Sequence, residues 1–236
     1  MPDPEEPNNA STPTWGPDQD PVVDGLLAAY AEGVFPMAEP GGDVYWYDPD
    51  PRGIIPLDDP VNGGGLRVSR SLRATIRSGR FRVTSDTAFK SVVRACGARR
   101  TGQSGDESWI DDRIVGAYTR LFEAGHAHSV EAWLDDTGEG DGDPLLVGGL
   151  YGVHLRGLFA GESMFSRPDL GGTDASKVCL VALYSHLRAR GFTLLDTQFM
   201  TDHLRSLGGV EISRRAYRDR LARALAVETA WGSFSD

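Results

Sequence analysis

The hydrophobic and polar positions of this chain follow two periods that change along its length. Apolar residues that recur every three to four positions, between capping residues and glycines, predict helices at residues 22–32, 69–78, 86–95, 112–125, 174–190, 202–207 and 214–227. Ser69 or Ser71 is the expected N-cap of the second helix, and Asp86 that of the third. Alternating or continuous apolar runs predict strands at residues 81–84, 128–134, 145–155, 157–165 and 193–198, with a hairpin turn at Arg156 and Gly157. This mixture of helices and strands predicts an α+β fold with a mixed sheet.

The same pattern divides the chain into three parts. Residues 1–21 are acidic and proline-rich without apolar periodicity, which predicts a disordered tail. Residues 22–65 are expected to form a small N-terminal domain that ends in a glycine-rich break. The aromatic run from Tyr45 to Tyr47 lies among prolines, so this segment must pack against another part of the protein. Residues 66–236 are expected to form the main domain.

Composition narrows the class of protein. No stretch approaches the run of about eighteen apolar residues that a membrane-spanning helix needs. Residues 1–20 have neither the basic n-region nor the apolar h-region of a signal peptide. The two cysteines, Cys96 and Cys179, are too few for a disulfide framework and lack the spacing of metal ligands. A cytoplasmic protein without membrane contact is therefore expected.

The formal net charge of −10 is unevenly distributed. Residues 1–51 contain eleven acidic residues and no Lys or Arg, whereas residues 66–100 contain ten basic residues and one acidic residue. Because a phosphate backbone responds to a local basic patch and not to the total charge, residues 66–100 are compatible with nucleic-acid binding. An ordinary solvated surface of arginine side chains is the alternative.

Three polar side chains interrupt apolar strands, and a buried polar group needs either a partner or a function. Glu162 lies in the second strand of the hairpin, where an ion pair with an arginine is the alternative to a functional role. Asp196 and Gln198 share one face of a later strand. Asp196 can accept a proton or orient an attacking amine, and the Gln198 carboxamide can donate to a developing oxyanion, as acyl transfer requires. A buried Asp–Gln hydrogen bond that only stabilises the strand is the alternative.

Two other segments carry weaker signals. His126 and His128 have the spacing of metal ligands but no third ligand at a recognisable distance, so a histidine at a helix C-terminus is favoured and no metal site is predicted. Trp109 precedes a predicted helix and is either an apolar staple or a platform for a base. The chain has no phosphate-binding loop, and the closest match to an acyl-CoA loop, residues 188–193, ends a helix instead of starting one. No cofactor is predicted.

Several motifs, taken in their order along the chain, resemble one family. They are AYAEGVFP at residues 29–36, WYDPDPR at 46–52, SRS at 69–71, WI at 109–110, GHAHSVE at 125–131, GGLYGV at 148–153, GESMFS at 161–166, ASK at 175–177, LDTQ at 195–198, DH at 202–203 and SLG at 206–208. This set is similar to the leucyl/phenylalanyl-tRNA–protein transferases of the bacterial N-end rule pathway.

The resemblance implies a small N-terminal domain and a catalytic domain with the N-acetyltransferase-like (GNAT) fold that does not use CoA. It implies transfer of leucine or phenylalanine, and of methionine less well, from aminoacyl-tRNA to acceptor proteins with an N-terminal Arg or Lys. By motif position, Asp196 and Gln198 are the catalytic pair, and Glu162 binds near the aminoacyl-adenosine end.

Further binding residues follow from the same resemblance. Trp109 is expected to stack on the terminal adenine, and Met37 and Trp46 are further substrate-binding residues. The pocket for the transferred side chain is expected to be lined by Leu150, Phe159, Leu180, Leu183 and Leu195, and an apolar pocket discriminates weakly between similar side chains. The candidates for binding the tRNA acceptor stem are Arg70, Arg73, Arg77 and Arg80, an assignment that depends on charge more than on motifs. A monomer is expected.

The chain departs from the family pattern at three places. Met37 stands where tryptophan is common, which replaces one aromatic wall of the adenine site with a flexible thioether. Thr197 stands where a cysteine is common, so no thiol nucleophile is needed there. The acidic tail replaces a glycine- and leucine-rich stretch that often precedes the first helix.

Two other functions remain open from the sequence. One is an aminoacyltransferase that builds peptide bridges on cell-wall precursors, although such enzymes usually carry a doubled domain. The other is a non-enzymatic RNA-binding module, which leaves Glu162, Asp196 and Gln198 without a role.

Overall fold

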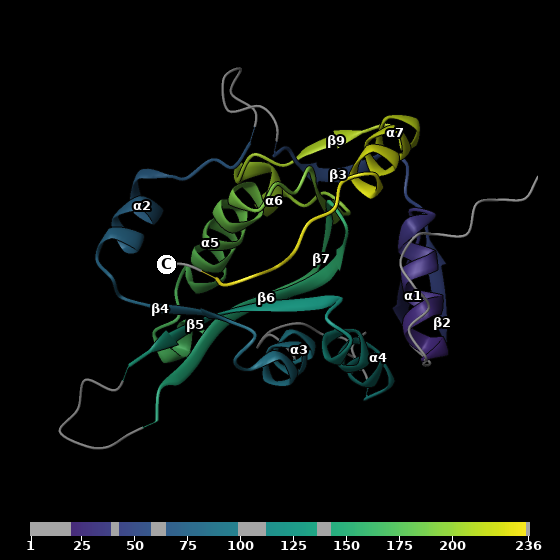
Figure 1. Ribbon diagram of the computed structural model, residues 1–236. Helices are drawn as coiled ribbons and strands as arrows, with labels where there is room; N and C mark the ends of the chain where they lie inside the picture. Colours follow the sequence, from purple (N-terminus) through teal and green to yellow (C-terminus); the bar gives the residue numbers. More distant parts are fainter. Residues whose placement is uncertain (1–19, 39–42, 58–64, 99–111, 136–142, 235–236) are drawn as a thin grey trace, which may run out of the picture.

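Most of the strand segments join one seven-stranded sheet in the computed structural model, which describes residues 20–38, 43–57, 65–98, 112–135 and 143–234 (Figure 1). The order of the strands in the sheet is β4-β5-β6-β7-β8-β3-β9. Their bounds are β3 (Arg52–Ile55), β4 (Arg82–Ser85), β5 (Ala127–Leu134), β6 (Leu145–Leu155), β7 (Leu158–Ser166), β8 (Leu194–Gln198) and β9 (Val210–Ile212). Neighbours are antiparallel except β7 and β8, which are parallel and are joined through a crossover helix. The predicted α+β class with a mixed sheet is confirmed.

Helices cover both faces of this sheet, so its central strands are buried on both sides (Figure 1). Those that bury apolar side chains in the core of one face are α1 (Pro21–Ala31), α3 (Phe89–Gly97), α4 (Asp112–Glu123) and α7 (Arg214–Leu225). Those that pack in the core of the other face are α2 (Arg70–Arg77), α5 (Ala175–Ala189) and α6 (Asp202–Ser206), and a 3-10 turn at Pro168–Leu170 precedes α5. We refer to these two faces as the α4 face and the α5 face. Among the described residues, no helix combines the length and the apolar character that crossing a membrane requires.

A small N-terminal region lies against the end of the main sheet. It contains α1 and a two-stranded antiparallel sheet of β1 (Phe35–Ala38) and β2 (Val44–Tyr47). The rings of Phe35 and Tyr47 contact the ring of Phe199, directly after β8, with centroids 5.7 and 6.2 Å apart. The predicted packing of this aromatic segment is therefore observed for Tyr47, whereas Tyr45 and Trp46 are 49% and 53% exposed. The next strand, β3, lies inside the main sheet between β8 and β9, and the division of the chain at residue 65 stays a prediction.

One predicted helix cap is wrong. Ser69 caps α2 as expected, because its hydroxyl accepts a hydrogen bond from the Leu72 amide at 3.1 Å. Asp86 does not cap α3, which begins at Phe89 without a side-chain cap. Asp86 instead has a left-handed backbone (φ 61°), and its carboxylate accepts a hydrogen bond from the Ser129 amide at 2.8 Å.

Two irregularities in the sheet determine how polar side chains are presented. The register between β6 and β7 pairs Tyr151 with Ser163 and Gly152 with Gly161, so Glu162 is the extra residue of a β-bulge. A second shift lies between β3 and β8, where Gly53 pairs with Gln198 and the next pair is Ile54 with Asp196. Bulges re-aim side chains, and these two occur beside each other at the β7–β8 junction.

Candidate active site

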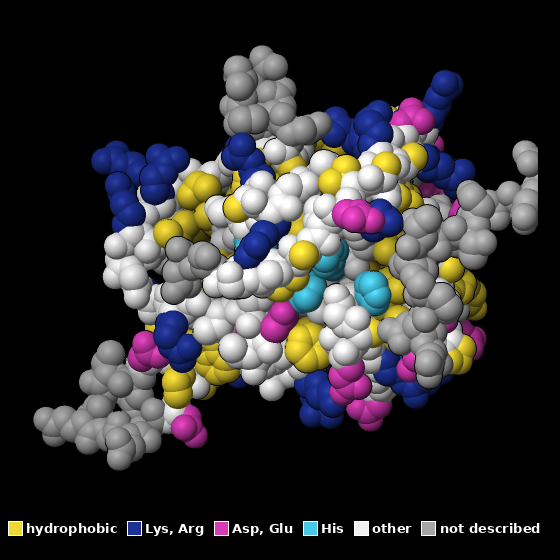
Figure 2. Space-filling view, viewed as in Figure 1, with side chains coloured by type: hydrophobic (Ala, Val, Ile, Leu, Met, Phe, Trp, Pro, Cys, Tyr) yellow, Lys and Arg dark blue, Asp and Glu magenta, His cyan; other side chains and the backbone are white. Residues whose placement is uncertain are grey.

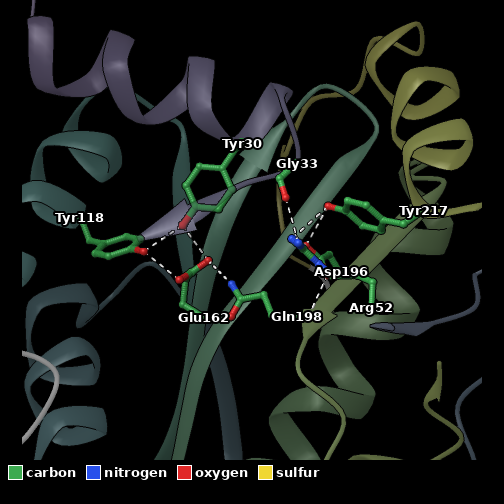
Figure 3. Close-up of polar contacts among 8 residues, drawn as sticks. All are labelled: Tyr30, Gly33, Arg52, Tyr118, Glu162, Asp196, Gln198 and Tyr217. Carbon is green, nitrogen blue, oxygen red and sulfur yellow. Dashed lines mark hydrogen bonds and ion pairs between the residues drawn. The ribbon is translucent and has the colours of Figure 1, made fainter. Parts of the chain in front are cut away.

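Glu162, the bulged residue of β7, is surrounded by hydrogen-bond donors from three other elements (Figure 3). The hydroxyl of Tyr30 on α1 donates to Oε1 at 2.8 Å, and that of Tyr118 on α4 donates to Oε2 at 2.7 Å. The side-chain amide of Gln198, at the end of β8, donates to Oε1 at 2.8 Å. The hydroxyls of Tyr30 and Tyr118 and the carboxamide of Gln198 thus fix both carboxylate oxygens of Glu162.

The environment of Glu162 makes it a titratable group near neutral pH. Burial raises the pKa of its carboxyl from 4.5 to about 7, although the hydrogen bonds of Tyr118 and Tyr30 act in the opposite direction. Burial and the charge of Glu162 also raise the pKa of both tyrosines well above 10, so their hydroxyls keep their protons. A carboxyl with a pKa near the working pH is suited to transferring a proton.

Asp196, by contrast, is bound to an arginine and is fully buried, with 0% of its surface exposed. Arg52 of β3 forms a two-pronged ion pair with it, Nε to Oδ1 at 2.9 Å and Nη2 to Oδ2 at 2.6 Å. The Tyr217 hydroxyl on α7 donates to Oδ2 at 2.9 Å, and the Gln198 backbone amide donates to Oδ1 at 2.8 Å. Arg52 thus binds Asp196, and no arginine among the described residues forms an ion pair with Glu162.

Gln198 connects the two carboxylates. Its backbone is left-handed (φ 62°), a conformation that non-glycine residues rarely adopt and that is often found at functional sites. Its backbone amide is bound to Asp196 and its side-chain amide to Glu162, so the two bonds hold the residue from both ends. The considered Asp–Gln hydrogen bond exists, but it uses the Gln198 backbone and leaves the carboxamide for Glu162.

Sequence reasoning missed four members of this cluster, Tyr30, Arg52, Tyr118 and Tyr217. Three are tyrosines on the apolar sides of helices, where the ring satisfies the helical pattern and hides the hydroxyl. Arg52 belongs to the WYDPDPR motif but lies in a short strand without apolar alternation. Its complete burial, at 1% exposure, is not visible in the pattern.

The five residues predicted for the side-chain pocket come together on the α5 face of the sheet. Leu150, Phe159, Leu180, Leu183 and Leu195 belong to one core cluster, and none is more than 5% exposed. Phe159 and Leu195 are direct neighbours in the parallel β7–β8 pair, one position before Ala160 and Asp196. The apolar group and the polar cluster therefore lie on opposite sides of the same two strands. Their role in binding a side chain stays a prediction.

The residues predicted to bind adenosine lie on the two-stranded sheet, except for Trp109, which lies outside the described residues. Met37 on β1 is half-buried against the α4-face core, and Trp46 on β2 is 53% exposed. Trp46 pairs with Pro36 and Met37 pairs with Tyr45. Because Phe35 and Tyr47 of this sheet contact Phe199, Met37 and Trp46 are held near the chain end of β8 that carries Gln198.

The four candidate tRNA-binding arginines are exposed on and after α2. Arg70, Arg73 and Arg77 follow helical spacing along one side of α2, and basic side chains gather over its place in Figure 2. Arg80 is oriented by a hydrogen bond to the Gly171 carbonyl at 2.6 Å. Within the described part of the chain, Arg70 and Arg77 have no ion-pair partner.

The histidines of the GHAHSVE motif do not share a site. His126 directly follows the end of α4, and its backbone amide donates to Leu121 at 2.7 Å, which agrees with a residue at a helix C-terminus. His128 lies in β5, where Nδ1 is 2.8 Å from the Asp86 carboxylate and its ring stacks on Trp231 at 4.1 Å. Among the described residues, no three potential ligands come close enough to hold a metal ion.

Comparison with known proteins identifies the family of this chain. The profile of a family described as leucyl/phenylalanyl-tRNA protein transferase matches residues 61–222. The chain belongs to this family. The profile of the family's N-terminal domain matches residues 20–50. The predicted family and its enzyme class are thereby confirmed.

Relatives that bear the name leucyl/phenylalanyl-tRNA--protein transferase are similar over nearly the whole chain. One from Paramagnetospirillum magneticum is 53% identical over 212 residues, which cover 89% of this chain and 91% of its own. One from Afipia carboxidovorans is 52% identical over 202 residues, covering 85% of this chain and 80% of its own. One from Herpetosiphon aurantiacus is 51% identical over 200 residues, covering 85% and 92%.

Among solved structures, a tandem GNAT protein from the clavulanic acid biosynthesis pathway is 17% identical, with a TM-score of 0.33 over 93% of this chain and 58% of its own. That similarity is too weak to bear on the fold, so the GNAT relationship stays an implication of the family resemblance. The two family profiles include Tyr30, Glu162 and Asp196, whereas Arg52 falls between their matched ranges.

Proposed function

We propose that this chain transfers leucine or phenylalanine, and methionine less well, from aminoacyl-tRNA to the N-terminal Arg or Lys of acceptor proteins. The observation that carries the proposal is the hydrogen-bonded pair of Gln198 and Glu162 at the bulged junction of β7 and β8. Membership of the family and the names of relatives that are about half identical support it. The place of such an enzyme is the cytoplasm, where the modified proteins enter the N-end rule degradation pathway.

The reaction is aminolysis of an ester. The acceptor α-amine, with an ordinary pKa of about 7.7–8, is partly neutral at cellular pH and needs orientation more than strong activation. Its nitrogen forms a bond with the ester carbonyl carbon, and the bond between that carbon and the ribose oxygen breaks. Glu162, as a carboxylate, accepts the proton that the amine loses and returns it to the ribose oxygen.

Gln198 and Asp196 have different tasks in this proposal. A carboxamide has two N–H donors, and Gln198 uses one of them on Glu162, which leaves the second for the developing oxyanion. Asp196 orients Gln198 through its backbone amide. The acyl ester supplies the driving force, so no cofactor or metal is part of the mechanism.

Substrate binding is assigned to three groups of residues. Leu150, Phe159, Leu180, Leu183 and Leu195 would accept the transferred side chain, since an apolar group of this kind tolerates both leucine and phenylalanine. Because these residues lie on the α5 face, the side chain would reach them past Ala160 and Asp196, the last residues that pair β7 with β8. Met37, Trp46 and Trp109 would contact the terminal adenosine. Arg70, Arg73, Arg77 and Arg80 would bind the acceptor stem by charge. The protein is proposed to act as a monomer.

The decisive experiment offers the purified chain Leu-tRNA or Phe-tRNA labelled in the amino acid, together with a reporter protein that begins with Arg or Lys. We expect covalent label on the reporter, and none on a matched reporter that begins with Gly. Binding of tRNA without transfer would favour an RNA-binding module. Label transferred only to a cell-wall precursor would favour a peptide-bridge enzyme, and either result would reject the proposal.

A further inference from the structure

Every acceptor position of the Asp196 carboxylate is occupied from within the protein. A carboxylate offers about four lone-pair sites, and Asp196 receives hydrogen bonds from Arg52 Nε, Arg52 Nη2, the Tyr217 hydroxyl and the Gln198 backbone amide. The side chain is also completely buried. Asp196 is therefore unable to contact a substrate without losing one of these bonds.

Arg52 is itself held on every side. Its guanidinium lies between the rings of Phe35 and Tyr217, 4.7 and 4.3 Å from their centroids, and its third nitrogen, Nη1, donates to the Gly33 carbonyl at 2.8 Å. Burial alone would lower the pKa of Arg52, but the hydrogen bonds and charge of Asp196 raise it overall, so the guanidinium stays charged. A planar fork of donors between two rings is a geometry that lysine cannot reproduce.

The contacts of Arg52 extend through Asp196 to Gln198 and Glu162. Asp196 Oδ1, fixed by Arg52, accepts the backbone N–H of Gln198 and so supports its left-handed conformation. That conformation places the carboxamide against Glu162 (Figure 3). The guanidinium thereby connects the end of α1, β3, β8 and α7 to the orientation of one side chain.

We propose that Arg52 and Tyr217 are positioning residues of the transfer site, which clamp Asp196 so that its only task is to hold Gln198 against Glu162. The proposal rests on the proposed function and deepens it, because it assigns proton transfer to Glu162 and not to Asp196. Neither Arg52 nor Tyr217 contacts Glu162, so both act through Asp196 and Gln198.

Two conservative variants test the clamp against a matched control. Tyr217→Phe removes one hydroxyl from Asp196, and Arg52→Lys keeps the charge but removes the fork. Tyr184→Phe is the control, because this hydroxyl lies on the α5 face and, among the described residues, donates to the Pro56 carbonyl and to no member of the polar cluster. We expect kcat to fall roughly tenfold in Tyr217→Phe and further in Arg52→Lys, with KM for aminoacyl-tRNA within about twofold of the wild type. Tyr184→Phe should keep the wild-type kcat.

A second measurement does not depend on transfer. The side-chain NH₂ of Gln198 is one of three glutamine signals in a ¹⁵N spectrum, with Gln19 and Gln103, and Gln198→Ala assigns it. The charged and polar groups around Glu162 among the described residues are Tyr30 on α1, Tyr118 on α4, Tyr151 on β6 and the two β8 residues Asp196 and Gln198. We expect the Gln198 NH₂ signal to titrate with Glu162 in the wild type and in Tyr184→Phe. In Tyr217→Phe the amplitude of that titration should fall at least twofold.

The outcomes separate the clamp from the proposed function. A wild-type protein that fails to transfer would reject the function, and the NH₂ titration would then decide the clamp alone. If the wild type transfers and Tyr217→Phe keeps its full kcat and its full titration, the clamp is rejected. A loss of kcat in Tyr217→Phe that Tyr184→Phe matches, at an equal loss of melting temperature, also rejects it. Should Arg52→Lys fail to fold, Tyr217→Phe alone decides.

Discussion

The Glu162 carboxylate lies between two tyrosine hydroxyls and a carboxamide, and their hydrogen bonds offset only part of the free-energy cost of burying its charge. At Glu162, burial dominates over the three hydrogen bonds, and the charge of Asp196 adds to it, which brings the pKa to about 7. Asp196 lies only two residues before Gln198 but has the opposite arrangement, with an arginine bound to both oxygens. The two carboxylates of the site are therefore suited to different tasks, Glu162 to exchange a proton and Asp196 to hold its hydrogen-bond donors in place.

The raised pKa of Glu162 predicts that this residue lowers stability at high pH. Because its pKa is about 7 in the folded chain against 4.5 unfolded, the stability it contributes is full below pH 4.5 and is lost as pH rises through 7. Glu162→Gln removes the ionisation, so it should stabilise the protein by up to about 3 kcal/mol at pH 8 relative to its effect at pH 4. Urea unfolding of both proteins at the two pH values measures this difference. An equal effect of the substitution at pH 4 and pH 8 would contradict the assignment.

Transfer should also depend on the ionisation of Glu162. If the carboxylate takes the amine proton, kcat/KM for the acceptor rises with pH through about 7, together with the rise from the acceptor amine itself. Glu162→Gln should remove the limb near pH 7 and keep that of the amine, while lowering the rate by roughly 100-fold or more. The pH profiles of the two proteins with one acceptor measure this. A profile of unchanged shape in Glu162→Gln would show that another group takes the proton.

At the scale of elements, the β6–β7 bulge depends on a glycine. A Cβ on Gly152 would come within 2.3 Å of the Ala160 carbonyl oxygen and 2.5 Å of the Phe159 ring. Gly152→Ala should therefore push β7 away from β6, destabilise the protein by about 2 kcal/mol or more, and reduce transfer because Glu162 moves with the bulge. Thermal unfolding and the transfer assay check both effects. Gly116→Ala is the control, since a Cβ there meets nothing within 4 Å, and in helix α4 alanine should stabilise slightly.

The long elements were predictable, and of the short ones only β4, β8 and α6 were predicted. The helices of eight or more residues and the long strands β5, β6 and β7 carry enough apolar positions to define a period. The strands β1, β2, β3 and β9 have three or four residues each. Prolines interrupt the segment that contains β1, β2 and β3, and the partners of β3 and β9 are distant in sequence. Their pairing is decided by tertiary contacts that no local pattern contains.

The same reasoning explains which site residues the sequence could identify. Glu162, Asp196 and Gln198 were visible because they are polar residues in apolar strands. Tyr30, Tyr118 and Tyr217 were hidden because an amphipathic helix buries a tyrosine as readily as a leucine. The sequence suggested an arginine partner for Glu162 and none for Asp196, because only the fold brings Arg52 on β3 beside β8.

At the scale of the whole molecule, the site is built from both ends of the chain. Tyr30 and Arg52 precede residue 66, and Tyr217 lies on the last helix, yet all are at most 2% exposed around Asp196 and Glu162. The residues before position 66 therefore complete the polar cluster as well as carrying Met37 and Trp46. The basic side of α2 lies at the opposite side of the molecule from α1 and α7, which carry Tyr30 and Tyr217, so tRNA binding and chemistry can be altered independently (Figure 1).

That separation gives a prediction for the tRNA-binding arginines. Arg70→Gln combined with Arg77→Gln removes two exposed charges on one side of α2 without touching its buried anchor, Leu72. Each lost phosphate contact reduces the slope of log K against log salt concentration by roughly one, so the slope of the double variant should be smaller by about two. The double variant should also bind aminoacyl-tRNA at least about tenfold more weakly. The value of kcat at saturating tRNA should stay at the wild-type level, because Glu162 and Gln198 are unchanged. Arg94→Gln, an exposed arginine on α3 of the opposite face, is the control for a general charge effect. If Arg94→Gln weakens binding as much as the change at each α2 position, the partner responds to the overall charge of the protein and α2 is not the binding surface.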